Sequence, residues 1–457
     1  MAETLTRTER LILTVAVLGS FVAFLDGTVV NVALPAIARD LGGGLTTQQW
    51  TVDAYLITLG ALILVAGAAS DAYGRILVLR VGLIGFGITS LAVAAAPTVE
   101  ILIAARALQG AAGAFLVPSS LALITSTMAE PVRSRAIGAW TALTTGAMVI
   151  GPLLGGLLVD YSSWRLVFVI NVLPIGLALR MLTALDLKDA ADRTARIDWW
   201  GAALCVSGLG LAVLALIELP AGGPPVPLWI ALGTGILLLA GFVWRQRRAP
   251  HPLLPLGLFR SRTFTSGNIA TFFVYAALSL NGFVLAVYLQ QGAGLSATLA
   301  GLASLPVTII MILLSSRAGI LAGRIGARLF MTVGPLIMAA GSLLLLAVGS
   351  PFDYWWQVLP GITLFGLGLA LTVSPLTAAI LGAADAAHAG IASAVNNAVA
   401  RIAGLLAVAA IAAITGGALD LDGFHRAALV TAALLAIGGI VSAIGIRNQH
   451  RAAPEPG

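Results

Sequence analysis

Three ionisable side chains lie deep inside apolar stretches in the first half of the sequence: Asp26, Asp53 and Arg106. At a helical rise of about 1.5 Å per residue, Asp26 and Arg106 lie roughly 14 Å, and Asp53 roughly 10 Å, from the expected outer ends of their stretches. All three can therefore share one layer. An arginine beside two carboxyl groups would keep one of them ionised and leave the other able to bind and release a proton. The spacing predicts a proton-coupling site.

A charge inside such a stretch is costly, by about 2.5–3.5 kcal/mol at the centre of a bilayer on insertion scales, and is therefore a functional hypothesis by default. Two plainer interpretations stay open. Asp26 and Arg106 could form a static pair that fixes helix packing, although buried pairs stabilise poorly. Asp53, which lies nearer the end of its stretch, could be a hydrated residue at the start of a helix.

In the second half of the sequence, the apolar stretch 388–416 carries the polar residues Asn396, Asn397 and Arg401, with no acidic residue near them. Ordinary interhelical hydrogen bonding is the expected role of its asparagines, whereas Arg401, about 20 Å along its helix, should face a cavity or a partner. His388 is better explained as a solvated loop residue than as a proton relay. We expect a largely apolar cavity for a small molecule, lined by Tyr55, Gln109, Phe272, Phe273, Tyr275, Asn281, Asn396, Asn397 and Arg401.

A run of small residues interrupts one apolar stretch. Its members are Gly146, Gly151, Pro152, Gly155 and Gly156. Small residues four positions apart let helices approach closely, and a proline inside a helix removes one backbone hydrogen bond. Tight helix packing and a role in gating explain this run about equally well.

The composition excludes a soluble globular protein. The 457 residues are 59% hydrophobic and only 10% charged, with a mean hydropathy of +1.01, whereas soluble domains carry about 25% charged residues. The net charge of +6 comes from basic residues in short connections, so it does not indicate nucleic-acid binding. With one cysteine, Cys205, and four scattered histidines, we expect no metal site, no cofactor and no catalytic triad.

The apolar residues form fourteen blocks, each about long enough to cross a bilayer, which takes roughly 20 residues. They span residues 11–35, 47–70, 76–96, 99–126, 136–159, 164–185, 198–218, 227–244, 264–291, 297–321, 327–349, 355–382, 388–416 and 426–446. Because the number is even, both termini should lie on the same side of the membrane.

The basic residues predict which side this is, because cytoplasmic loops are enriched in lysine and arginine. Only three basic residues lie at the ends opposite the termini: Arg39, Arg165 and Arg426. Twenty lie on the side of the termini: Arg7, Arg10, Arg75, Arg80, Arg133, Arg135, Arg180, Lys188, Arg193, Arg196, Arg245, Arg247, Arg248, Arg260, Arg262, Arg317, Arg324, Arg328, Arg447 and Arg451. We expect both termini to be cytoplasmic.

Two short patterns recur at an offset of about 250 residues. Gly44-Leu45-Thr46 recurs as Gly294-Leu295-Ser296, and the glycine-rich segment 67–75 is echoed by 319–328. Parallel repeats of this kind occur in transporters built from two six-helix halves. We expect an N-terminal bundle at 1–190, an inserted transmembrane hairpin with a cytoplasmic linker at 191–262, and a C-terminal bundle at 263–457.

On these motifs the chain resembles the 14-helix drug:proton antiporter branch of the major facilitator superfamily over nearly its whole length. Residues 25–35, which contain Asp26, resemble the first-helix motif of that branch, and residues 106–113 resemble the fourth-helix motif implicated in proton transfer. The glycine run resembles the fifth-helix motif of exporters. Gly67, Asp71, Gly74 and Arg75 match the motif between helices two and three, whose charges latch the two halves.

The chain departs from the family pattern at two places. The loop motif usually has a basic residue after its aspartate and another after its Gly-Arg, but here these positions are Ala72 and Ile76. This implies a weaker latch, for which Arg80 is a candidate substitute. Some multidrug members carry acidic residues in second-half helices that handle dications, and their absence here argues against dicationic substrates.

The resemblance implies an all-helical membrane protein of the bacterial inner membrane, surrounded by lipid, that acts as a monomer. It would export amphipathic or apolar small molecules, such as drugs, antibiotics or dyes, in exchange for protons. A rival within the same class is a dedicated exporter of an endogenous metabolite or lipid. A rival of a different class is a polytopic membrane enzyme, for which the sequence offers no buried catalytic constellation.

Overall fold

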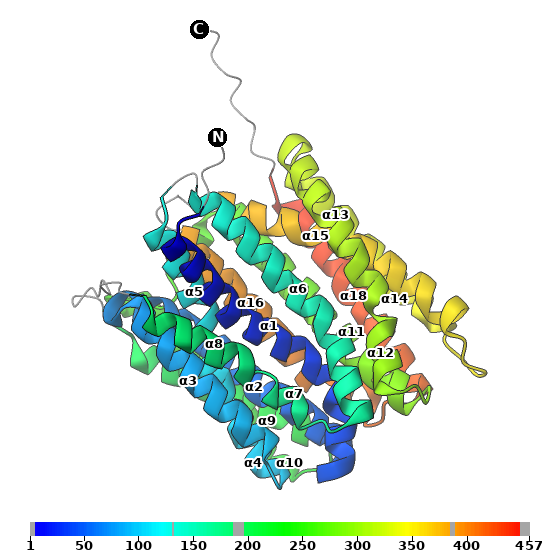
Figure 1. Ribbon diagram of the computed structural model, residues 1–457. Helices are drawn as coiled ribbons and strands as arrows, with labels where there is room; N and C mark the ends of the chain where they lie inside the picture. The colour runs from blue at the N-terminus through cyan, green and yellow to red at the C-terminus, as the bar shows by residue number, and fades with distance from the viewer. Residues whose placement is uncertain (1–4, 130–131, 186–195, 384–388, 448–457) are drawn as a thin grey trace. The chain divides into compact units, whose positions relative to one another are not determined.

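The computed structural model describes residues 5–129, 132–185, 196–383 and 389–447, and in these ranges the regular structure is helical (Figure 1). Within them, thirteen helical segments are long and apolar enough to cross a membrane, and the helix at 132–161 contributes a shorter apolar segment, Ile150–Tyr161. His388, Lys188, Arg193 and Arg451 lie outside the described residues.

The chain divides into two compact units. Unit 1 contains Met1–Pro255, Ser279–Ser304 and Arg401–Ala427, and unit 2 contains Leu256–Leu278, Leu305–Ala400 and Ala428–Gly457. The sequence-based division at 190 and 262 follows chain order instead, and it stays a prediction.

The first six apolar blocks form helices that lie in unit 1. The helices are α1 (Arg7–Leu41), α2 (Gly44–Tyr73), α3 (Arg75–Ala94), α4 (Val99–Gly113), α5 (Leu116–Thr127), α6 (Val132–Tyr161), α7 (Leu166–Val169) and α8 (Val172–Thr183). The fourth and sixth blocks are each interrupted, between α4 and α5 and between α7 and α8. In contrast, α6 runs on through Pro152 as one helix of 30 residues.

Local sequence explains where these helices begin and how they pack. At the start of α1, Thr6 and Glu9 form a reciprocal capping box, which satisfies backbone donors that a helix start leaves free. The core of this part of unit 1 is built from buried side chains of α1, α2, α3, α5 and α8, for example Ile12, Tyr55, Leu79, Leu123 and Ile175. Apolar packing of α1 against its neighbours therefore fixes the depth of Asp26.

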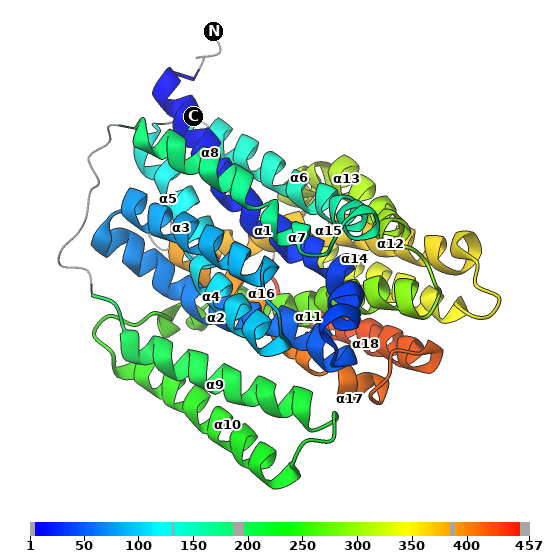
Figure 2. The same ribbon diagram turned by 60° about the horizontal axis from the view of Figure 1, so that its bottom comes forward.

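The expected inserted hairpin consists of α9 (Trp199–Glu218) and α10 (Pro225–Arg248). Helix α9 lies between α10 and α2 (Figure 2). Its buried side chains Cys205, Leu209 and Val213 pack in one cluster with Ile57 of α2. At the far end, the indole nitrogen of Trp50 donates a hydrogen bond to Glu218 at 2.8 Å. The hairpin is thus joined to α2 along its length.

The second half of the chain contributes further helices to both units. They are η1 (Leu256–Arg260), α11 (Arg262–Gln291), α12 (Ala297–Ala303), α13 (Leu305–Ile325), α14 (Ala327–Leu344), η2 (Leu345–Ala347), η3 (Tyr354–Val358), α15 (Leu359–Gly382), α16 (Ala389–Ala409), α17 (Ile411–Thr415) and α18 (Leu421–Gly445). The core of unit 2 joins α11, α14, α15 and α18 through buried residues such as Val274, Met338, Phe365 and Leu435.

The internal repeat is visible in the backbone. Gly74, between α2 and α3, has φ 97° and ψ 142°, and Gly326, between α13 and α14, has φ 99° and ψ 147°. Side chains other than hydrogen are disfavoured at such positive φ, so the glycines of the two loop motifs are required by the same sharp turn.

Candidate proton-coupling site

A buried ion pair joins α1 to α4. One guanidinium nitrogen of Arg106 lies 2.7 Å from a carboxylate oxygen of Asp26. Asp26 is 0% exposed and Arg106 is 1% exposed. The sequence-based expectation that these two residues meet inside the first half of the chain matches this geometry.

Gln109 binds both members of the pair, one helical turn beyond Arg106. Its side-chain oxygen accepts a hydrogen bond from Arg106 at 2.7 Å, and its side-chain nitrogen donates to the second carboxylate oxygen of Asp26 at 3.1 Å. The same nitrogen donates to the hydroxyl of Ser90 at 2.8 Å. Gln109, predicted as a cavity residue, therefore belongs to the charged cluster in this structure.

Asn171 completes the polar environment of Asp26 from the break between α7 and α8. Its side-chain nitrogen donates at 3.4 Å to Asp26 and at 3.5 Å to Ser90. Sequence reasoning missed both Ser90 and Asn171. The one available signal was that each is a polar residue inside an apolar block, which is too common a feature to single them out.

Arg106 is held from three further directions. Its Nε donates to the backbone carbonyl of Thr51 at 2.9 Å. Its guanidinium carbon lies 4.3 Å from the ring centre of Tyr55 and 5.6 Å from that of Phe168, within the range of cation–π attraction. The guanidinium is thus held by a carboxylate, an amide, a carbonyl and two rings. A change of charge at Asp26 would remove one of these interactions and leave the others in place.

Asp53 does not join this cluster. It is 0% exposed, and neither of its carboxyl oxygens has a hydrogen-bond partner among the described residues. Two carboxyl groups on neighbouring helices therefore have unlike surroundings: Asp26 has a cation and amide donors, and Asp53 has neither.

The other predicted cavity residues are spread over the two units. In unit 2, the rings of Phe272 and Phe273 meet edge to face at 5.6 Å, and Tyr275 borders the core. Asn396 donates to Thr271 at 2.8 Å and to Asn268 at 3.3 Å, the interhelical bonding expected for it. Three further predicted residues are half-buried: Asn281, Asn397 and Arg401.

The glycine run of α6 makes close backbone contacts. An added Cβ at Gly151 would overlap the hydroxyl of Thr28, and one at Gly155 would lie 2.7 Å from Cγ2 of Val29 in α1. One at Gly156 would lie 2.6 Å from Cα of Thr298 in α12. Gly146 has no such neighbour within 4 Å.

The carbonyl of Pro152 faces Gly301 of α12 at a distance that leaves no room for a side chain. Most of the run therefore serves close packing, and its role in gating stays a prediction.

The loop motif lies at the surface of unit 1. Asp71 and Arg75 approach to 3.7 Å, with 62% and 31% of their side chains exposed. An exposed pair one helical turn apart contributes little to stability. Gly67 has open space around it. The proposed latch function of these residues stays a prediction.

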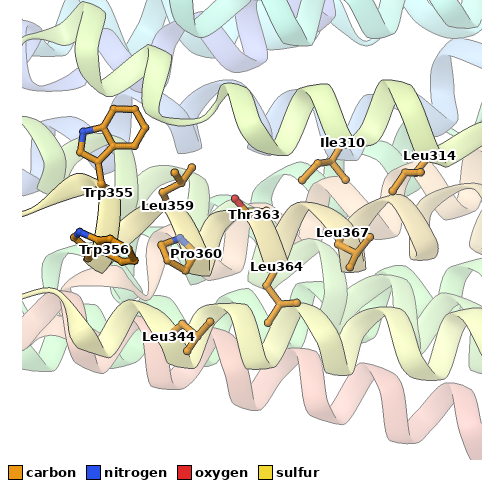
Figure 3. A pocket seen from close by; sticks show the side chains of 10 residues that line it. All are labelled: Ile310, Leu314, Leu344, Trp355, Trp356, Leu359, Pro360, Thr363, Leu364 and Leu367. Carbon is orange, nitrogen blue, oxygen red and sulfur yellow. The ribbon is translucent and has the colours of Figure 1, made fainter.

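Unit 2 has an apolar surface groove, which Figure 3 shows running from Trp355 and Trp356 at one end to Leu314 and Leu367 at the other. The two indole side chains are 69% and 80% exposed, as is usual for tryptophans at a membrane interface. No charged residue lines the groove, so it has none of the features of the cluster around Asp26.

Comparisons with known proteins agree with this architecture. A family profile described as the Major Facilitator Superfamily matches residues 16–408. The chain is 33% identical over 413 residues to a methylenomycin A resistance protein of Bacillus subtilis (strain 168), covering 90% of this chain and 88% of that protein. It is 36% identical over 399 residues to the multidrug resistance protein Stp of Mycobacterium tuberculosis (strain CDC 1551 / Oshkosh), covering 86% and 73%.

Among solved structures, the chain superposes on a D-xylose–proton symporter with a TM-score of 0.70 at 14% identity, covering 96% of this chain and 98% of that one. At this identity the likeness concerns the fold alone. The fold class predicted from the fourteen apolar blocks and the family resemblance read from the motifs are both confirmed. The chain belongs to the Major Facilitator Superfamily.

Proposed function

We propose that the protein is a proton-coupled antiporter that exports amphipathic or apolar small molecules by alternating access. The observation that supports this most is the buried pair of Asp26 and Arg106, with a further buried carboxyl at Asp53. Relatives that match most of the chain are named as resistance proteins against methylenomycin A and against multiple drugs. An exporter of such compounds needs an energy source, and we propose that this is the proton gradient, with protons crossing the protein by binding to buried carboxyl groups.

The geometry suggests how proton binding and movement are linked. While Asp26 is ionised, it binds Arg106 and keeps α1 and α4 together. A proton that reaches Asp26 removes the charge that holds the guanidinium, so the attraction between the two helices weakens. Asp53 is the second candidate for the proton-binding group, because neither of its carboxyl oxygens has a hydrogen-bond partner among the described residues. Proton release toward the cytoplasm would restore the pair.

We place the protein in the inner membrane of a bacterium as a monomer, with both termini cytoplasmic. The support for this orientation is the excess of basic residues on the side of the termini, since cytoplasmic connections carry most lysine and arginine.

The decisive variant is Asp26→Asn, which keeps the size of the side chain but cannot bind and release a proton at that position. We expect it to insert normally and to bind a neutral dye such as Nile red, while dye accumulation in everted vesicles with an acidic lumen is lost. Asp53→Asn is the companion variant. If Asp26→Asn accumulates dye at the wild-type rate under the pH gradient, Asp26 is not the coupling group.

A further inference from the structure

Arg401 is a cation in a membrane-spanning helix and forms no ion pair with any carboxylate of the described residues. It belongs to α16, eight residues before the end of that helix, and its side chain is half-buried. No carboxylate among the described residues lies within 4.0 Å of its guanidinium. A charged residue inside a membrane-spanning helix is energetically costly unless it is paired or hydrated. Arg401 is therefore a candidate binding residue for an anion.

The base of Arg401 is fixed against α2. Its Cβ lies 3.4 Å from the position that a Cβ on Gly60 would occupy. One and two turns further along α16, Leu405 and Ala409 pack in the same cluster as Ile57 of α2. Because the backbone is held in this way, the position of the guanidinium varies only by rotation of the side chain.

The charges near Arg401 do not balance it. The positive charge of Arg106 is matched by Asp26 at 2.7 Å. Asp53 lies seven residues before Gly60, which is about two helical turns or roughly 10 Å along α2, and it makes no ion pair with Arg401. Among the described residues, no carboxylate therefore contacts the guanidinium of Arg401, which lies beside an apolar helix contact.

We propose that Arg401 binds an acidic group of the exported compound, so that the substrates are amphipathic organic acids with a carboxylate or a similarly acidic hydroxyl group. A guanidinium binds a carboxylate through two parallel hydrogen bonds, which gives orientation as well as attraction. The apolar side chains around it suit the rest of an amphipathic molecule. This inference rests on the proposed export function and adds to it the charge of the substrate.

The proposal is tested with a matched pair of probes, dansyl-leucine and its methyl ester, which differ in one negative charge. Binding is measured by fluorescence on the purified protein, and export is measured in everted vesicles. We expect the wild type to bind the acid at least about tenfold more tightly than the ester, since a guanidinium forms charge-assisted hydrogen bonds with a carboxylate but not with a neutral ester.

Arg401→Gln should abolish this preference while leaving the binding of the ester unchanged, and Arg401→Lys should keep part of it. Arg317→Gln is the matched control, because Arg317 is exposed on α13 and should not affect the preference.

Three results would overturn the proposal. The wild type could show no preference for the acid, or Arg401→Gln could weaken the binding of both probes equally, which would indicate a structural role. The double variant Arg401→Gln/Asp53→Asn could also recover the preference for the acid that Arg401→Gln alone has lost. This would indicate that these two side chains pair in another state of the protein. The proposed function is judged separately: if the wild type exports the ester under a pH gradient and Asp26→Asn does not, proton-coupled export stands even where the acid is not preferred.

Discussion

Gln109 is the residue that links the two charges of the buried cluster. An amide has one accepting and one donating end, and here the accepting end faces Arg106 while the donating end faces Asp26. Gln109 therefore holds the two charged side chains in fixed positions relative to each other.

Gln109→Leu tests this role at the scale of one residue. The variant removes one hydrogen-bond donor from Asp26 and one acceptor from Arg106, and a hydrogen bond to a charged group contributes about 1.5–3 kcal/mol. We therefore expect the pH profile of dye export to differ from that of the wild type. Gln290→Leu is the matched control, because Gln290 donates only to backbone carbonyls, those of Val32 and Ala286. An unchanged profile in Gln109→Leu would contradict the assignment.

The individual residues of the cluster differ in how well the sequence predicts them. Asp26 and Arg106 stand out because charges are rare in apolar blocks, and the helical rise predicts their depth. Depth says nothing about which face of a helix points to which neighbour. For this reason the sequence could not predict that Asp53 makes no hydrogen bond to Arg106. It could not predict the contribution of Ser90 either, because hydroxyl groups in apolar helices commonly bond to their own backbone.

At the scale of helices, α6 shows why small residues recur on one face. Gly155 allows the backbone of α1 to come so close that an added Cβ would lie 2.9 Å from the carbonyl oxygen of Val29. Gly146, on the same helix, has open space at the corresponding position. The two glycines look alike in sequence, and only the arrangement of the helices separates their roles.

The matched pair Gly155→Leu and Gly146→Leu uses this difference. Overpacking costs typically about 1–3 kcal/mol, so Gly155→Leu should lower the melting temperature of the detergent-solubilised protein and abolish dye export. Gly146→Leu should melt like the wild type, and any loss of export in that variant would then favour a role in gating. Equal melting temperatures for Gly155→Leu and the wild type would show that the close contact between α1 and α6 is not needed for stability.

The inserted hairpin depends on a cap at its first helix. Asp198, 6% exposed, accepts hydrogen bonds from the backbone of Gly201 at 3.0 Å, from Arg245 at 2.6 Å and from Gln246 at 3.1 Å. Burial alone would raise the pKa of Asp198, but these hydrogen bonds and the charge of Arg245 outweigh it, so the pKa lies below its usual value. The other end of the Gln246 side chain accepts from the backbone of Leu254 at 3.1 Å, which ties the linker to the same cap.

Asp198→Ala should destabilise the hairpin by about 1–2 kcal/mol, the upper range for the loss of a helix cap. Because the pKa is lowered in the folded protein, the stabilisation is present above the unfolded pKa of about 3.9 and declines as the pH falls through the folded value. Thermal melts of the variant and the wild type should thus differ at pH 7 and converge toward pH 3. Asp71→Ala is the control, since Asp71 is exposed and its pair with Arg75 spans 3.7 Å. A difference in melting temperature between Asp198→Ala and the wild type that is as large at pH 3 as at pH 7 would contradict the role of the Asp198 charge.

At the scale of the whole molecule, hydropathy predicts the helices. Long apolar blocks must become helices, because only internal hydrogen bonds satisfy a backbone in lipid. The units depend instead on contacts between distant segments. The side chain of Asp160, at the end of α6, accepts hydrogen bonds from the backbone of Ala297 and Thr298 at 3.0 and 2.7 Å. The amide of Gln49 donates to the carbonyls of Val408 and Ala409. Such hydrogen bonds join parts of the second half of the chain to unit 1, and no sequence pattern predicts these bonds.

The orientation of the whole molecule in the membrane is the remaining prediction, and it follows from 20 basic residues at one set of helix ends and three at the other. The native Cys205 is buried and is replaced by alanine, so that single cysteines can be introduced at exposed positions. Ala221→Cys lies in the turn between α9 and α10, and Ala129→Cys follows α5. A membrane-impermeant maleimide should label Ala221→Cys in intact cells and Ala129→Cys only after permeabilisation, because an excess of basic residues marks the cytoplasmic side. Labelling of Ala221→Cys only from the cytoplasm would contradict fourteen spans with cytoplasmic termini, and it would also place the proton-coupling cluster at the wrong depth for a proton that arrives from outside.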